Sequence, residues 1–124
     1  MGTKIRIRAG SVTVEAELNE SETAKAIAAA LPIRGTVNTW GEEIYFTIPV
    51  DRPAAADARS EVQVGELGYW PPGKAFCIFF GPTPASIDEN PRAASPINPI
   101  GKLLDDPKKL LQVKDGEEIV IEPA

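Results

Sequence analysis

Residues 68–84 read Gly68-Tyr69-Trp70-Pro71-Pro72-Gly73-Lys74-Ala75-Phe76-Cys77-Ile78-Phe79-Phe80-Gly81-Pro82-Thr83-Pro84, and they decide how the chain folds. This stretch holds five of the eight aromatic residues and four of the twelve prolines in the sequence. Its second half, Ala75–Phe80, is a continuous run of apolar residues, which is typical of a strand buried on both faces. Alternation along such a strand predicts two opposite sets of side chains, Ala75, Cys77 and Phe79 against Phe76, Ile78 and Phe80.

The segments on either side of this run set its limits. Pro71-Pro72-Gly73 predicts a turn directly before the strand. Val62 and Val64 predict an extended segment that leads into the stretch. Residues 81–99 are rich in proline and predict a long structured loop, a feature that in small domains is usually functional or packed over something.

The beginning of the chain predicts a β-hairpin. Residues 4–8 and 12–18 alternate apolar and charged side chains on either side of Ala9-Gly10-Ser11. The first arm carries basic residues and the second acidic ones, so the two sets meet across the pair. We therefore interpret this face as exposed and charge-paired, and not as a basic patch for a polyanion.

Residues 21–31 predict the main helix. Asn19 or Ser21 can cap its start, and Pro32 ends it. The apolar positions recur at helical spacing and form one stripe: Ala24, Ile27, Ala28 and Leu31.

The rest of the chain predicts short strands and one more helix. Residues 36–40 and 44–48 form a second hairpin candidate, and 100–104 and 118–122 predict further strands. Asp106-Pro107 predicts a short helix over about 106–112. Many short strands with mostly hairpin connections favour one mainly β, mostly antiparallel domain over residues 1–124, either a barrel or a sandwich.

Composition excludes several kinds of chemistry. With 13 basic and 18 acidic residues the net charge is −5, which argues against a nucleic-acid surface. No apolar run reaches the length of a membrane span, and no secretory leader is recognisable. The sequence contains no histidine and one cysteine, so His-based catalysis and zinc sites are excluded. We expect a cytoplasmic protein with no metal and no cofactor.

Two features have structural explanations. Cys77 lies inside the apolar run and is expected to be a buried, unreactive thiol. The adjacent carboxylates Glu42 and Glu43 would point to opposite sides of a strand, so they predict no two-carboxylate site.

Two segments together resemble a known family. Gly65-Glu66-Leu67-Gly68 continuing through Pro84, followed by Ser95-Pro96-Ile97-Asn98-Pro99-Ile100-Gly101-Lys102-Leu103, resembles the small cyclophilin-like proteins of bacteria and archaea. The resemblance covers the whole chain. It implies a small closed β-barrel, mostly antiparallel, with one main helix at about 21–31 and a short helix at about 106–112. It implies a fold and names no activity.

The resemblance to true cyclophilins, which are peptidyl-prolyl isomerases, is more distant. Their catalytic arginine lies on a strand that corresponds roughly to Thr36–Trp40, which contains no arginine. The histidine of their proline pocket has no counterpart, whereas Phe79 or Phe80 matches a pocket phenylalanine. Arg34 precedes this strand and Arg92 lies in the predicted loop, so either could reach a groove, but neither lies in the matching motif.

These observations favour a binding module without catalysis. It would hold a peptide or a small ligand in a shallow aromatic groove. The candidate groove residues are Trp40, Tyr45, Tyr69, Trp70, Phe79, Phe80 and Arg92.

Two alternatives stay open. The first is a weak peptidyl-prolyl isomerase, which would need a donor aimed at the prolyl nitrogen. The second is a subunit or homodimer whose protein partner carries the chemistry.

Overall fold

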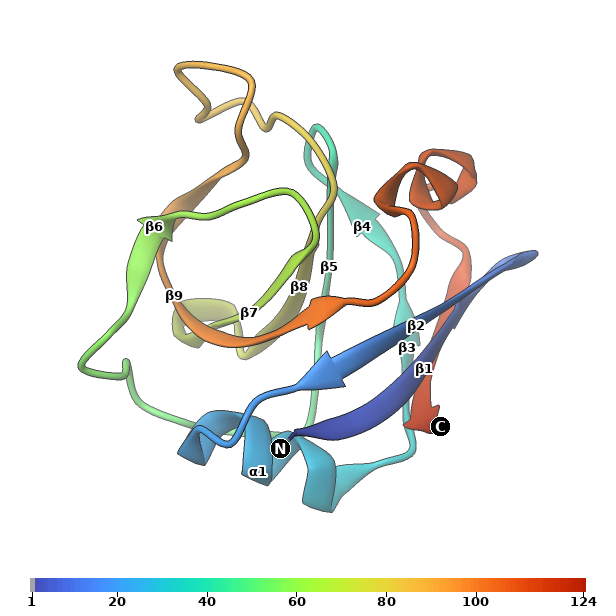
Figure 1. Ribbon diagram of the computed structural model, residues 1–124, viewed down its shortest axis with the longest axis vertical. Helices are drawn as coiled ribbons and strands as arrows, with labels where there is room; N and C mark the ends of the chain where they lie inside the picture. Colours follow the sequence, from blue (N-terminus) through green and yellow to red (C-terminus); the bar gives the residue numbers. More distant parts are fainter. Residues whose placement is uncertain (1) are drawn as a thin grey trace.

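The computed structural model describes residues 2–124, and antiparallel strands dominate it (Figure 1). Met1, the first residue of the predicted domain, lies outside the described residues. The helical segments are α1 (Glu22–Ala30) and two 3-10 helices, η1 (Pro71–Gly73) and η2 (Pro107–Gln112). The strands are β1 (Thr3–Ala9), β2 (Val12–Leu18), β3 (Ile33–Thr36), β4 (Asn38–Thr39), β5 (Glu43–Thr47), β6 (Arg59–Glu61), β7 (Glu66–Trp70), β8 (Ala75–Phe79), β9 (Arg92–Leu103) and β10 (Glu118–Pro123).

The strands form one strongly curved sheet whose two ends are consecutive on the chain (Figure 1). The order is β3-β10-β1-β2-β9-β7-β8-β5-β4, with β6 paired to β9. Only Val37 separates the end strands β3 and β4. Its N–H donates to Glu117 at 2.8 Å and its carbonyl accepts from Gly116 at 2.9 Å, so both backbone groups are used by the turn before β10. Because β3 and β4 do not pair as strands within residues 2–124, the predicted closed barrel is not confirmed.

The strand β8 is buried on both faces, as predicted. Phe76, Ile78 and the following Phe80 belong to the main core, where the Phe76 ring lies 5.7 Å from that of Phe46. The opposite face contributes to a smaller apolar cluster, against which Tyr45 and Trp70 pack. The members of this smaller cluster are Val62, Ala75, Cys77, Phe79, Ala93 and Ile97.

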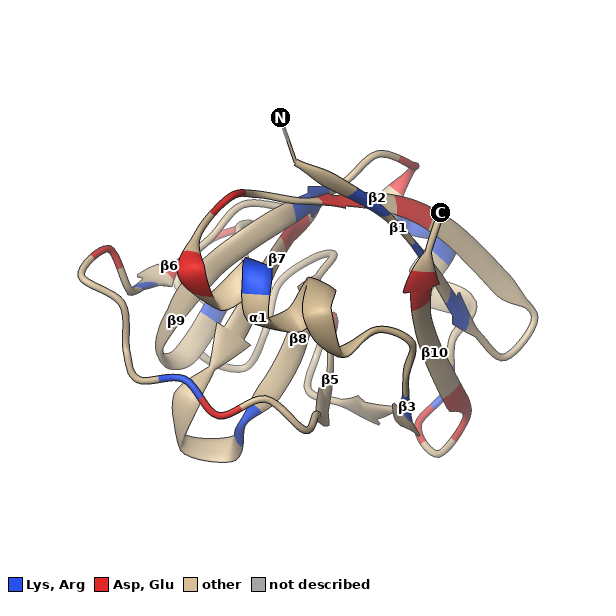
Figure 2. Ribbon diagram, turned by 90° about the horizontal axis from the view of Figure 1, so that it is seen from below, with Lys and Arg blue, Asp and Glu red and all other residues tan. Residues whose placement is uncertain are grey.

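The helix α1 lies across one open side of the ring that the curved sheet forms (Figures 1 and 2). The Ser21 hydroxyl caps it by accepting from the Ala24 N–H at 3.2 Å. Ala24 and Ile27 are fully buried, as the apolar stripe predicts.

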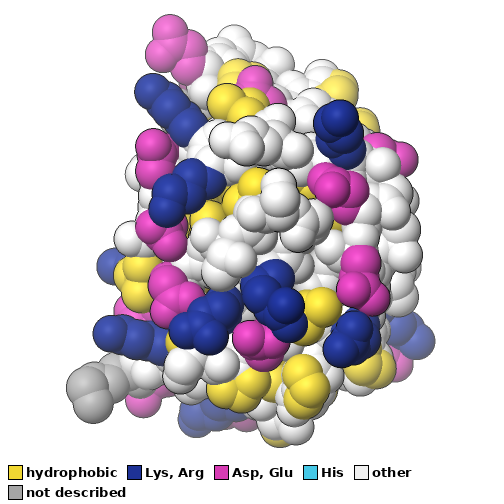
Figure 3. Space-filling view, turned by 90° about the vertical axis from the view of Figure 1, so that its right-hand side faces the viewer, with side chains coloured by type: hydrophobic (Ala, Val, Ile, Leu, Met, Phe, Trp, Pro, Cys, Tyr) yellow, Lys and Arg dark blue, Asp and Glu magenta, His cyan; other side chains and the backbone are white. Residues whose placement is uncertain are grey.

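The outer face of β1, β2 and β10 is a network of opposite charges. Arg6 pairs with Glu15 at 3.0 Å, and Arg8 pairs with Glu122 at 2.9 Å. Figure 2 shows that acidic and basic residues both occur along these strands, and Figure 3 shows side chains of both charges interspersed on this side of the molecule. The interpretation as a charge-paired face is confirmed.

The predicted loop 81–99 is wrong in its second half. Strand β9 begins at Arg92 and absorbs the strand expected at 100–104. The prolines that suggested a loop are tolerated because the pairing of β9 with β7 shifts register at Pro99, and Pro96 is exposed. Upstream, the extended segment β6 ends at Glu61, before the two valines that predicted it.

Tyr69 holds the segment that follows β5 through its buried hydroxyl. This hydroxyl donates to the Val50 carbonyl at 2.6 Å and accepts from the Arg52 N–H at 3.2 Å. We expect Tyr69→Phe to lower the free energy of unfolding by about 1–3 kcal/mol, because it leaves both backbone groups without a partner. Urea denaturation measures this, with Tyr45→Phe as the matched control, which should change stability by less than about 0.5 kcal/mol. Equal effects of the two substitutions would contradict this role for Tyr69.

Candidate functional site

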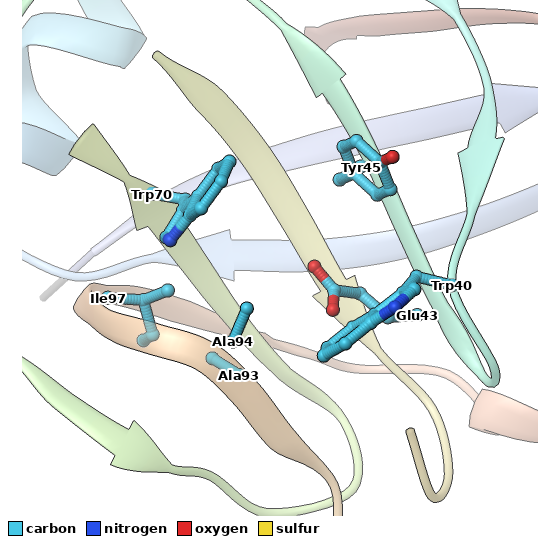
Figure 4. Close-up of a pocket in the computed structure, with 7 residues that line it drawn as sticks. All are labelled: Trp40, Glu43, Tyr45, Trp70, Ala93, Ala94 and Ile97. Atoms are coloured by element: carbon cyan, nitrogen blue, oxygen red, sulfur yellow. The ribbon is translucent and has the colours of Figure 1, made fainter. Parts of the chain in front are cut away.

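A pocket of about 220 Å³ opens on the outer face of β5 and β8, beside the smaller apolar cluster (Figure 4). Its volume is below the roughly 300–1,000 Å³ of sites for drug-sized ligands, so it suits a smaller molecule. The wall is mainly apolar and comes from the turn before β5, from β5 itself, from the end of β7 and from β9. The lining residues are Trp40, Glu43, Tyr45, Trp70, Ala93, Ala94 and Ile97.

Trp70 is fixed as a rigid wall of the pocket. Its indole Nε1 donates to the Ser95 hydroxyl at 2.7 Å. Its ring lies close to Gly73, where an added Cβ would approach Cε3 to 2.8 Å. The Pro71-Pro72-Gly73 turn, observed as the 3-10 helix η1, thus places a residue without a side chain against the indole.

A second glycine makes room for Ile97. Gly68 lies in β7 next to β9, and a Cβ added there would lie 2.7 Å from Ile97 Cδ1. The Ile97 side chain therefore occupies the space above Gly68 while it lines the pocket. A larger residue at position 68 would push this side chain out of that space.

Glu43 brings a carboxyl group into this apolar pocket. Figure 4 shows the carboxyl between the indoles of Trp40 and Trp70. The residue is only 6% exposed. Burial raises the pKa of Glu43 from 4.5 to about 7, and a hydrogen bond with the Cys77 thiol acts in the opposite direction. At neutral pH this carboxyl therefore exists in both protonation states.

Cys77 lies behind this carboxyl. Burial raises the pKa of the Cys77 thiol well above its usual range, and the nearby Glu43 charge adds to the effect. The thiol is therefore protonated near neutral pH, in agreement with the prediction that it is unreactive.

Only some of the predicted groove residues line this pocket. Trp40, Tyr45 and Trp70 line the pocket together. Phe79 lies in the smaller cluster, and Arg92 pairs with Glu61 at 3.3 Å beside a different, polar hollow. The remaining two are part of the main core: Tyr69 and Phe80.

Sequence reasoning missed Glu43 as a pocket residue. The signal was present, since Glu43 and Tyr45 are two apart and so share a face of β5. That face pairs with the Cys77 and Phe79 side of β8. Ile97 was missed because its segment was expected to be a loop.

Two further structural results bear on function. No helix within residues 2–124 is both long and apolar enough to cross a bilayer. Across the same residues, no group of three or more Cys, Asp or Glu side chains is placed to hold a metal ion.

The family model described as cyclophilin-like matches residues 3–122, so the chain belongs to the cyclophilin-like family. Among curated proteins, none matches the chain in sequence. The solution structure of the hypothetical protein AF2241 from Archaeoglobus fulgidus is similar, with a TM-score of 0.84 and 45% identity. The similarity covers 99% of this chain and 95% of that protein.

A more distant structure shares the fold. McbB, solved in complex with tryptophan, gives a TM-score of 0.71 at 17% identity. The similarity covers 96% of this chain and 44% of McbB, so this chain corresponds to less than half of that protein.

The arginines considered for isomerase chemistry are engaged away from the pocket. Arg34 pairs with Glu118 at 3.4 Å on an exposed sheet surface, and Arg92 pairs with Glu61. Neither is among the described residues that line the pocket.

The raised pKa of Glu43 predicts a pH-dependent stability. A carboxyl whose pKa is higher in the folded state favours folding below pH 4.5, and this contribution is lost as the pH rises through about 7. The Glu43→Gln variant has no carboxyl at this position, so it does not have to bury a charge when the pH rises. We expect its stability advantage over the wild type to be small at pH 4.5 and to reach on the order of 3 kcal/mol at pH 8.

Urea denaturation of both proteins at pH 4.5, 6 and 8 measures the difference. Glu42→Gln, the adjacent substitution outside the pocket, is the control and should track the wild type. A Glu43→Gln advantage that does not change with pH would show that the carboxyl is not held in this environment.

Proposed function

We propose that this protein is a binding module that holds a small organic molecule in the pocket between β5, β7 and β9. The observation that carries the proposal is the convergence of Trp40, Tyr45 and Trp70 on one mainly apolar pocket that also contains the Glu43 carboxyl. Pockets with aromatic walls and few polar groups are the usual form of small-molecule sites. The apolar walls supply affinity, and the carboxyl supplies orientation.

The fixed walls support the same proposal. Trp70 is held by its hydrogen bond to Ser95 and by packing against Gly73, and Ile97 is held by packing against Gly68. A ligand that enters such a pocket does not have to order these side chains, so less binding free energy is lost.

The fold is compatible with a small ligand. McbB, which shares the fold, was solved in complex with tryptophan. At 17% identity this likeness concerns the fold alone, so the proposal rests on the pocket.

The other predicted functions have less support. An isomerase needs a donor aimed at the prolyl nitrogen, and none of the described residues that line the pocket is an arginine. A homodimer, a protein partner and a cytoplasmic location stay predictions, and sedimentation velocity tests the first of them.

Filling the pocket tests the proposal. Ala94 lines the pocket but is exposed, so Ala94→Phe adds a ring to the wall without entering the core. Both tryptophans of the chain line the pocket, so intrinsic fluorescence reports directly on occupancy. We expect benzyl alcohol and related aromatic fragments to change the emission of the wild type, and Ala94→Phe to weaken their binding at least about tenfold.

Ala94→Ser is the matched control and should bind like the wild type. Both variants should keep the wild-type urea midpoint, because position 94 contributes no core side chain. Equal binding by Ala94→Phe and the wild type would place the ligand elsewhere. No response to a broad panel of aromatic fragments would contradict the proposed function.

A further inference from the structure

We propose that the ligand of this pocket is an organic cation whose charged group lies against the Glu43 carboxylate and the aromatic side chains of Trp40, Tyr45 and Trp70. This inference rests on the proposed function and names the chemical class of the ligand.

The pocket contains an acidic group without a basic one. Among the described residues that line it, Glu43 is the only acidic residue and none is Lys or Arg. A buried carboxylate without a positive partner is costly, since little water reaches it. An ammonium or amidinium group on the ligand supplies the missing charge, whereas a carboxylate ligand would be repelled.

The basic residue that directly precedes the β9 part of the wall in the sequence is engaged elsewhere. Arg92 directly precedes Ala93 in β9, and its guanidinium pairs with Glu61 at 3.3 Å. Among the described residues, this leaves the pocket without a cation of its own that would compete for Glu43.

The aromatic walls favour the same class of ligand. The face of an indole or a phenol attracts a cation, and tryptophan does so most strongly. The Trp70 Nε1 already donates to Ser95, so this indole group is not free to donate to an anion in the pocket. Figure 4 shows Trp40, Tyr45 and Trp70 arranged around the carboxyl. Three aromatic rings with one acidic group form a cage typical of organic cations.

The groups around Glu43 allow its proton to be displaced. The titratable neighbours are Cys77 on β8 and Tyr45 on β5. The wall residues from β7 and β9 do not titrate: Trp70, Ala93, Ala94 and Ile97. Because Glu43 has a pKa of about 7, a cation that binds the carboxylate must compete with its proton. Cation affinity is therefore expected to rise as the pH rises.

Three probes with the same ring and different charge test the inference. Benzylamine is a cation at neutral pH, benzyl alcohol is neutral and benzoate is an anion. Tryptophan fluorescence, checked by calorimetry at pH 8, gives their dissociation constants for the whole chain. We expect benzylamine to bind at least about tenfold more tightly than benzyl alcohol, and benzoate to bind most weakly.

The pH dependence identifies the group responsible. The ionised fraction of a carboxyl with a pKa of about 7 rises about tenfold between pH 6 and pH 8. Benzylamine keeps its charge over this range and should bind about tenfold more tightly at pH 8. Glu43→Gln should remove both this pH dependence and the preference for benzylamine over benzyl alcohol. Glu42→Gln, the control, should retain both.

The outcomes separate the inference from the proposed function. Equal affinity for benzylamine and benzyl alcohol, or tighter binding of benzoate, overturns the inference and leaves the binding module standing. A cation preference that survives in Glu43→Gln also overturns it. Failure of all three probes to bind counts against the proposed function itself, and the inference fails with it.

Discussion

Burial of β8 on both faces is the constraint on which the other elements depend. Because side chains alternate along a strand, the apolar side chains on each face of β8 must be buried by a separate set of neighbours. The main core fills the first face with side chains from β1, β2, β5, β10 and α1. The second face is covered by β9 and by Val62 after β6. The residues that bury this second face leave a gap beside Trp70 and Tyr45, and this gap is the pocket.

The pKa of Glu43 is raised because the residue lies at the edge of the second, buried face of β8. The side chain pairs across the sheet with the Phe79 position and lies near the Cys77 thiol, so its surroundings are mainly apolar. An apolar site disfavours the charged form of a carboxyl, and Glu43 at the same time lines the pocket. A buried acid with a shifted pKa in a concave site is a feature of functional sites, although structural networks also produce it.

The parts of the fold that depend on local periodicity were predictable. The alternation in residues 75–80, the hairpin over 4–18 and the helical stripe of 21–31 each need only neighbouring residues. The extent of β9 was not predictable, because its prolines are tolerated through a register shift against β7. The positions at which the sheet ends were also not predictable, because they depend on hydrogen bonds between distant residues, here those of Val37 with Gly116 and Glu117.

The candidate site was predicted only in part for the same reason. Tyr69 and Trp70 are adjacent and equally aromatic, but they point to opposite faces of β7. Only the pairing of β7 with its neighbours decides which of them enters the core. Glu43 can be recognised as a site residue only when the pairing of β5 with β8 is known.

Gly68 and Gly73 shape the pocket wall, since Ile97 and Trp70 pack directly against them, and an added Cβ would lie 2.7 Å from the Ile97 side chain or 2.8 Å from the Trp70 ring. Neither glycine is among the described residues that line the pocket, and neither belongs to the main core. These two positions can therefore serve as a marker within the cyclophilin-like family. Members that carry larger residues there are expected to retain the sheet and to have a smaller or closed pocket.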